Sequence, residues 1–210
     1  MALSVEVIPN GPIVGNALVI WDSATKQAIV VDPGDEPERI AACPRFLGLS
    51  TTEIVCTHAH IDHAGAVGAV KRKLGAPFAV HSAEKPVLDT LAAQASMWGL
   101  GDTEVPEVDR WLEDGDIVRI GEHEGRVIHT PGHTPGGCCL FFESARILVA
   151  GDTLFQGSIG RTDLPGGSYR QIIASIKDKL LPLGDDIVVY CGHGPTTTLG
   201  TEARYNPFLR

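Results

Sequence analysis

The sequence Thr57-His58-Ala59-His60-Ile61-Asp62-His63 brings three histidines and one aspartate into six consecutive positions, directly after the strand-like residues 53–56. The whole chain has 8 histidines in 210 residues. A random chain of this composition would contain the pattern His-x-His-x-Asp-His on the order of one time in a thousand. We therefore interpret this stretch as a metal-binding cluster rather than a solvated polar loop.

The spacing of these residues fits a strand that runs into a helix. Alternate residues of an extended chain share a face, so His58, His60 and Asp62 can point the same way. His63 then turns with the chain into a helix that we expect to begin near residue 62 or 63, where the positive helix end favours a carboxylate. Imidazole and carboxylate ligands together suit zinc, iron or manganese better than calcium or magnesium.

Three further strand-like stretches also end on a residue that can bind a metal. His133 lies among the turn residues 130–137, Asp152 follows residues 146–151, and His193 follows residues 187–192. In layered α/β proteins, ligand sites collect at strand ends. A lone histidine at a strand end is more often structural, but the joint pattern predicts one site built from all these residues.

In this order, the motifs resemble the metallo-β-lactamase superfamily along essentially the whole chain. Within it, residues 151–155 followed by Gly157-Ser158-Ile159-Gly160-Arg161-Thr162-Asp163 are similar to glyoxalase II, the hydroxyacylglutathione hydrolases. Residues 164–168 and 192–197 resemble the short bacterial form of that group, which lacks a helical carboxy-terminal domain.

The resemblance implies a four-layer αβ/βα sandwich with a two-metal cleft, and we expect a single domain over residues 1–210. The order of strand-like and helical stretches also favours a sandwich over a doubly wound sheet. By the same resemblance, one metal would be held by His58, His60 and His133, and the other by Asp62, His63 and His193, with Asp152 bridging them. Zinc is the metal we expect in both positions, with iron or manganese as alternatives.

The reaction implied by the resemblance is hydrolysis of a thioester, with S-D-lactoylglutathione as the expected substrate. Two cations about 3.5 to 4 Å apart can share a hydroxide and lower its pKa to near 7. Asp62 and Asp152 would act in catalysis as the metal ligands that position this hydroxide. A thiol of pKa near 8.5 leaves as a thiolate without a positioned acid.

Two other residues are expected to contact the substrate, and one to support the ligands. Arg161 stands where longer glyoxalase II enzymes place a basic residue against the glutathione glycine carboxylate, although it could equally form a surface ion pair. Phe155 is the second expected contact. Asp32, at the end of the strand-like residues 28–31, resembles the superfamily's early acid that hydrogen-bonds metal ligands, against the alternative of a plain turn or cap acid.

Departures from other branches of the superfamily narrow the chemistry. Flavodiiron-like members would have a glutamate in place of His60, and antibiotic-hydrolysing lactamases a cysteine in place of Asp152. The net charge of -9, from 17 Lys+Arg against 26 Asp+Glu, argues against nucleic acid as a partner. Two alternatives stay open: a mononuclear-iron persulfide dioxygenase of the same superfamily, and a non-catalytic binding module, which would be expected to lack a ligand.

Composition and cysteine usage bear on the compartment. The 43% hydrophobic content is enough for one substantial core. The first residues show neither a basic stretch nor a long apolar run, so we expect no signal peptide and no membrane span. Five cysteines without paired spacing favour reduced thiols and a cytoplasmic enzyme. The oligomeric state is not predicted.

Helical patterns are expected at residues 36–47, interrupted by Pro44, at residues 85–98 and at residues 169–180. In the second of these, the apolar side chains are expected in the core: Val87, Leu88, Leu91, Ala95 and Met97. Of the remaining histidines, we expect His81 and His129 to be structural and His123 to lie in solvent.

Overall fold

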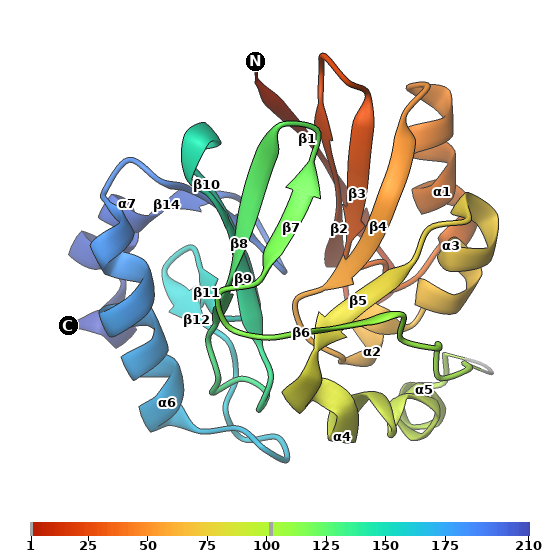
Figure 1. The fold of residues 1–210 in the computed structure, drawn as a ribbon. Helices are drawn as coiled ribbons and strands as arrows, with labels where there is room; N and C mark the ends of the chain where they lie inside the picture. The colour runs from red at the N-terminus through yellow and green to blue at the C-terminus, as the bar shows by residue number, and fades with distance from the viewer. Residues whose placement is uncertain (1, 101–102) are drawn as a thin grey trace.

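The computed structural model describes residues 2–100 and 103–210. Within these residues, two six-stranded sheets face each other, and helices cover the outer face of each sheet (Figure 1). The layers follow one another as helices, sheet, sheet and helices. The four-layer αβ/βα sandwich expected from the sequence is therefore confirmed.

The first sheet is built from the amino-terminal half of the chain, and its strands lie side by side in chain order. Antiparallel pairing joins the first three strands, and parallel pairing joins the last three to them. The strands are β1 (Leu3–Asn10), β2 (Gly15–Asp22), β3 (Gln27–Val31), β4 (Ser50–Cys56), β5 (Phe78–His81) and β6 (Arg110–Leu112).

The second sheet comes from the carboxy-terminal half, and only its β10–β13 pair is parallel among the described strands. Its strands lie in the order β14 (Thr197–Thr198), β13 (Val188–Cys191), β10 (Ile147–Gly151), β9 (Cys138–Phe142), β8 (His123–His129) and β7 (Ile117–Ile120). A small hairpin of β11 (Leu154–Phe155) and β12 (Ser158–Ile159) follows β10.

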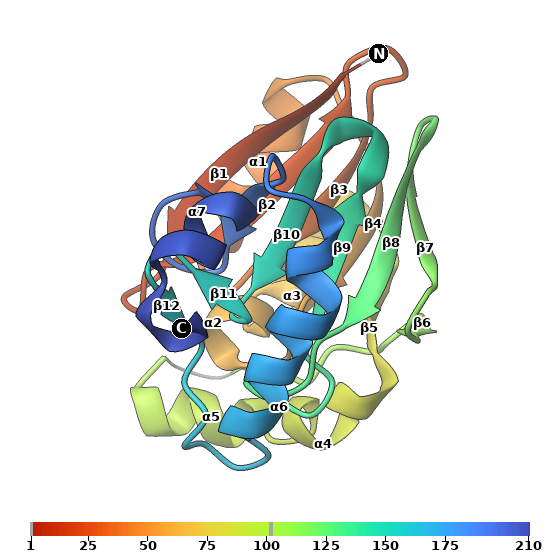
Figure 2. The same cartoon turned by 90° about the vertical axis from the view of Figure 1, so that its left-hand side faces the viewer.

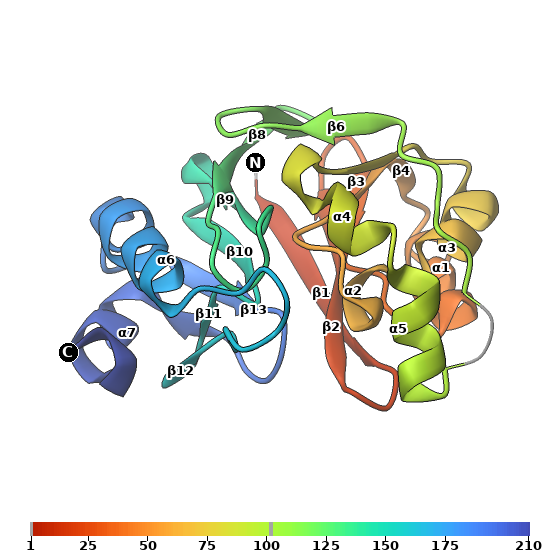
Figure 3. The ribbon, with the colours of Figure 1, turned by 90° about the horizontal axis from the view of Figure 1, so that it is seen from below.

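Helices on the outer faces complete the sandwich. The first sheet is covered by α1 (Pro37–Phe46) and α3 (Val67–Leu74), and the second by α6 (Tyr169–Ala174), which continues as a π-helical stretch Ser175–Leu180, and α7 (Leu199–Tyr205) (Figure 2). Three short helices lie together below the first sheet (Figure 3): α2 (Ile61–Ala64), α4 (Lys85–Leu88) and α5 (Leu91–Trp98). Single 3-10 turns span Ser82–Glu84, Glu143–Ala145, Leu181–Leu183 and Pro207–Leu209.

No helix in the described ranges is long and apolar enough to cross a membrane.

Strand alternation explains how one sheet serves two cores. In β2, Leu18 and Ile20 point into the layer between the sheets, whereas Ala17 and Val19 point toward the helices outside. Successive side chains of a strand face opposite sides, so a strand that is covered on both faces can be apolar throughout. The same layer between the sheets buries Leu140 and Phe142 of the second sheet.

Three details differ from the sequence expectations. Residues 85–98 form two helices, because the backbone N–H and hydroxyl of Thr90 both bond to the Val87 carbonyl and end the first one. Leu88, Leu91 and Ala95 are buried as expected, but Met97 is 82% exposed. The assignment of Met97 to the core was wrong because Met97 lies two residues after the buried Ala95, about 200° around the same helix, and therefore faces away from the core.

The other two differences concern Pro44 and His123. Pro44 does not interrupt its helix but lies inside α1, in the final turn. His123 is buried rather than solvated, because its ring packs at the start of β8 and its Nδ1 lies 3.1 Å from the Ser144 hydroxyl.

The layer between the sheets should dominate the stability of the fold. Replacing the fully buried Phe142 in the variant Phe142→Ala is expected to lower the free energy of unfolding by about 3 to 5 kcal/mol, because a cavity would remain between two packed sheets. Urea unfolding measures this loss. Phe46→Ala is the control, since Phe46 is 91% exposed; a similar loss in both variants would contradict this account of the core.

Candidate metal centre

All seven residues expected to bind metal come together at one end of the sandwich. His58 and His60 lie in the loop after β4, and Asp62 and His63 lie in α2. The second sheet contributes the other three, each beyond the carboxyl end of a strand: His133 after β8, Asp152 after β10 and His193 after β13. The helix that was expected to begin near residue 62 or 63 begins at Ile61.

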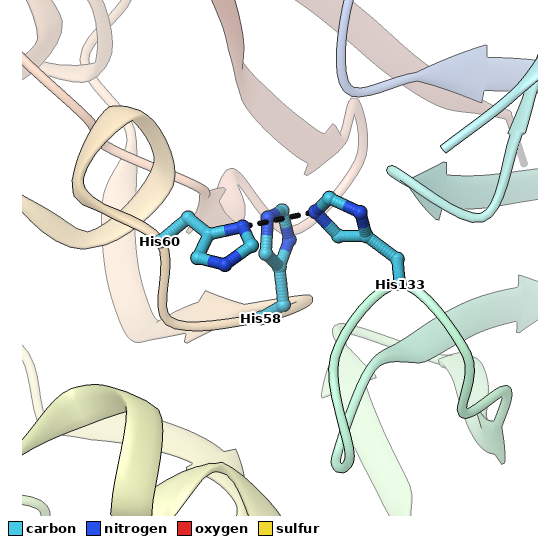
Figure 4. A group of neighbouring side chains, drawn as sticks. All are labelled: His58, His60 and His133. Atoms are coloured by element: carbon cyan, nitrogen blue, oxygen red, sulfur yellow. Dashed lines mark hydrogen bonds between the residues drawn. The ribbon is translucent and has the colours of Figure 1, made fainter. Parts of the chain in front are cut away.

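Three imidazoles form the first group, as Figure 4 shows. The Nδ1 atom of His60 lies 2.9 Å from Nε2 of His133, and the ring of His58 lies 4.9 Å and 4.8 Å from the rings of His60 and His133. Burial lowers the pKa of His58 well below its ordinary value and that of His60 to about 4. Near neutral pH these rings are therefore uncharged, which is the form that binds metals.

The second group consists of Asp62, His63 and His193. Nε2 of His193 lies 3.2 Å from both Asp62 Oδ2 and His63 Nε2. Burial opposes charge on all three residues, yet the acids raise the pKa of His63 and His193, and the two imidazoles lower the pKa of Asp62. The group therefore attracts positive charge, which a proton or a metal cation can provide.

Asp152 lies between the two groups. Its Oδ1 is 3.3 Å from His63 Nε2, and its Oδ2 is 3.6 Å from Nε2 of both His133 and His193. One carboxylate thus reaches histidines of both groups: its Oδ2 lies near one histidine of each group, and its Oδ1 lies near His63 of the second group.

Two buried atoms at the centre test whether metals fit these residues. Among the described residues, neither Nε2 of His58 nor Oδ1 of Asp152 has a hydrogen-bond partner. A buried polar atom without a partner is costly, and native proteins rarely retain one without a role. Nitrogen and carboxylate donors of this kind are the usual ligands of zinc and iron, so the residues fit divalent cations.

Asp32 supports this centre from behind. Its Oδ1 accepts a hydrogen bond of 2.7 Å from the Thr57 N–H, and its Oδ2 one of 2.7 Å from the Thr57 hydroxyl. The same Oδ2 lies 3.2 Å from His63 Nδ1. Asp32, His58 and His63 are also close enough to form a third group of possible ligands. Because Thr57 engages both carboxylate oxygens, the geometry favours an orienting contact to the His63 ring over metal binding.

Two glycines explain why the motifs read Gly-Asp and Gly-His. Gly151 has a φ of +48°, and a side chain there would collide with Thr57. At Gly192, a side chain would overlap the carboxylate of Asp152. The backbone can therefore bring Asp152 and His193 against the loop after β4 only when these positions have no Cβ.

The two expected substrate contacts differ in their surroundings. The ring of Phe155 lies 6.0 Å from the ring of His193, edge to face. The carbonyl of Arg161 lies 2.8 Å from His133 Nδ1, but its side chain is exposed and paired with Asp163 at 2.7 Å. Phe155 therefore adjoins the centre, whereas the side chain of Arg161 forms the surface ion pair that was the alternative.

Three supporting residues were not identified in the sequence. The side chains of Asn16, Glu84 and Gln94 bond to the backbone of the ligand loops, and the Oε1 of Gln94 accepts a hydrogen bond from the Ile61 N–H. No motif distinguishes them in the sequence. His81 and His129 stack on each other at 4.2 Å and bond to backbone atoms of Ala83 and Pro135, in keeping with structural roles.

Comparison with known proteins agrees with this geometry. The model of the metallo-beta-lactamase superfamily matches residues 10–193. Hydroxyacylglutathione hydrolase GloC of Haemophilus influenzae is 39% identical over 209 residues, which cover 99% of this chain and 98% of that protein.

Two solved structures are similar over almost their whole length. One, described as the BLEG-1 B3 metallo-beta-lactamase, has a TM-score of 0.91 and 39% identity, covering 98% of this chain and 99% of that one. The other, TTHA1623 in a di-iron-bound form, has a TM-score of 0.87 and 38% identity, covering 97% and 100%. With its two mixed sheets, flanking helices and centre of histidines and aspartates, the chain belongs to the metallo-β-lactamase superfamily.

Proposed function

We propose that this metallo-hydrolase cleaves a thioester, with S-D-lactoylglutathione as its substrate. The observation that carries the proposal is the position of Asp152, whose two oxygens face histidines of both ligand groups. The name of the GloC relative, at 39% identity over nearly the whole chain, supports the choice of substrate class. Retention of all seven ligand residues argues against a binding module without activity.

In this proposal His58, His60 and His133 would hold one cation, Asp62, His63 and His193 would hold the other, and Asp152 would contribute to both sites. Such a pair supplies a nucleophile at neutral pH and a Lewis acid for the carbonyl oxygen. Zinc is the metal we propose, with iron as the alternative supported by the di-iron-bound relative. Asp62 and Asp152 would act in catalysis as ligands that hold these cations and so position the nucleophile that the cations supply.

The leaving group explains why no further acid is needed. A thiol of pKa near 8.5 departs as a thiolate at neutral pH. Outside the two ligand groups, His81 and His129 make their hydrogen bonds to backbone atoms. Neither is therefore assigned a proton-transfer role.

We further propose that Phe155 and Arg161 contact the substrate. Phe155 offers an apolar edge beside His193. The guanidinium of Arg161 already pairs with an exposed carboxylate, and a substrate carboxylate could replace that of Asp163 at little cost, since exposed ion pairs contribute about 0 to 1 kcal/mol.

The five free cysteines support a reducing, cytoplasmic setting.

Two other activities compete with this proposal. β-Lactam hydrolysis is suggested by the name of the BLEG-1 structure, at 39% identity. Persulfide oxidation by a single iron would use two histidines and one carboxylate, as in the group Asp62, His63 and His193. A single iron would leave one of the two ligand groups without a metal, so the presence of ligand residues in both groups favours two metals.

The purified protein should contain about two metal ions per chain, because the ligand residues form two groups, and should release thiol from S-D-lactoylglutathione. Metal analysis, a thiol-release assay, a β-lactam hydrolysis assay and oxygen uptake with glutathione persulfide measure this together. A chelator-treated sample is the control and should lose activity. One iron with oxygen uptake, or β-lactam hydrolysis without thiol release, would overturn the proposal.

Loss of Asp152, which faces both ligand groups, should affect metal content differently from loss of His193, which belongs to one group. Asp152→Ala is expected to lower the content of both metals, because its oxygens face both groups, whereas His193→Ala should mainly lower the second. Metal content after equilibration with limiting chelator measures the difference, with Asp163→Ala, an exposed acid outside both groups, as the control. Equal losses from both positions in the His193 variant would contradict the assignment.

A further inference from the structure

The seven residues of the candidate metal centre come from two halves of the molecule, one built around each sheet. Four ligands follow β4 of the first sheet, and three follow strands of the second sheet. Their mutual distances therefore depend on how the two halves are held against each other. Two buried polar side chains, Glu84 and Asn16, cross between the halves close to the ligands.

Glu84 bridges the two loops that carry the three-histidine group. It lies at the end of the turn after β5 and is completely buried. Its Oε2 accepts a hydrogen bond of 2.7 Å from the N–H of Ala59, which lies between His58 and His60. Its Oε1 accepts one of 2.7 Å from the N–H of Gly136, three residues after His133. Both oxygens must accept, so an amide cannot reproduce the pair of bonds.

Asn16 makes the corresponding connection at the other group. It is the second residue of β2 and is 6% exposed. Its Nδ2 donates to the carbonyls of Cys191 and Gly194, at 3.0 Å and 2.9 Å, and its backbone N–H donates to the carbonyl of Gly192 at 2.7 Å. These three carbonyls surround His193 on both sides along the chain.

We propose that Glu84 and Asn16 are positioning residues, each of which fixes the geometry of one ligand group: Glu84 that of His58, His60 and His133, and Asn16 that of His193 with its partners. The inference rests on the metal binding proposed above. Outer partners that hold metal ligands in place typically contribute 10- to 100-fold to metal affinity. A residue that only stabilised the fold would not discriminate between the two groups.

The test isolates each group by removing one ligand of the other. In a His193→Ala background the three-histidine group remains, and in a His60→Ala background the other group remains. Glu84→Gln and Asn16→Ala are added to each background, and zinc affinity is measured by competition with a chromophoric chelator. Glu84→Gln should weaken zinc about 10- to 100-fold in the first background only, and Asn16→Ala in the second only.

Glu202→Gln is the matched control. Glu202 is likewise a buried acid, 1% exposed, that accepts hydrogen bonds from a backbone N–H and from side chains, at Gly157, Thr197 and Asn206. Its substitution should lower thermal stability without selective loss of zinc in either background. If Glu84→Gln or Asn16→Ala fails to fold, Glu84→Asp or Asn16→Ser replaces it with the same expectation.

The outcomes separate this inference from the function on which it rests. Equal weakening in both backgrounds, or no weakening in either, overturns the positioning roles. Failure of the unsubstituted protein to bind zinc or another divalent metal overturns the proposed metal binding instead. Selective, reciprocal loss supports both.

Discussion

Two aspartates and five histidines lie together in one small, partly buried region, and the surrounding structure has to offset the electrostatic cost of gathering these groups. Burial disfavours charge on every one of these groups, whereas the contacts between acids and imidazoles favour it. Even so, atoms of His58 and Asp152 are left without partners among the described residues. A cluster of this kind persists only if positive charge can occupy its centre.

The centre also requires the backbones of its loops to lie very close together. This requirement explains two glycines and one unusual backbone conformation near the metal-binding residues. Gly151 and Gly192 leave room for Thr57 and the Asp152 carboxylate. Asp32, at a φ of +52°, turns its carboxylate toward Thr57 and the His63 ring. Strand ends, glycines and buried acids together fix the ligands before any substrate arrives.

The sandwich was predicted correctly from the resemblance of the motifs to the superfamily, and the seven residues that this resemblance assigned to metal do lie together at one end of the fold. The sequence was not sufficient for Glu84 and Asn16. Their hydrogen bonds span 52 and 175 positions along the chain, and a single acid before Lys85-Pro86 or a single asparagine in a strand resembles many surface residues. The break at Thr90 was missed for a different reason: the N–H and the hydroxyl of Thr90 both bond to the Val87 carbonyl and end a helix whose apolar pattern continues.

Assembly of the centre from both halves has a consequence for folding. His63 and His193 meet across 130 positions, so their contact requires the two halves of the molecule to be docked against each other. A cation bound by both would add its binding free energy to the docked state alone. Because the ion would bind the docked state and not the unfolded chain, the fraction of chains in the docked state would rise with the free concentration of the ion.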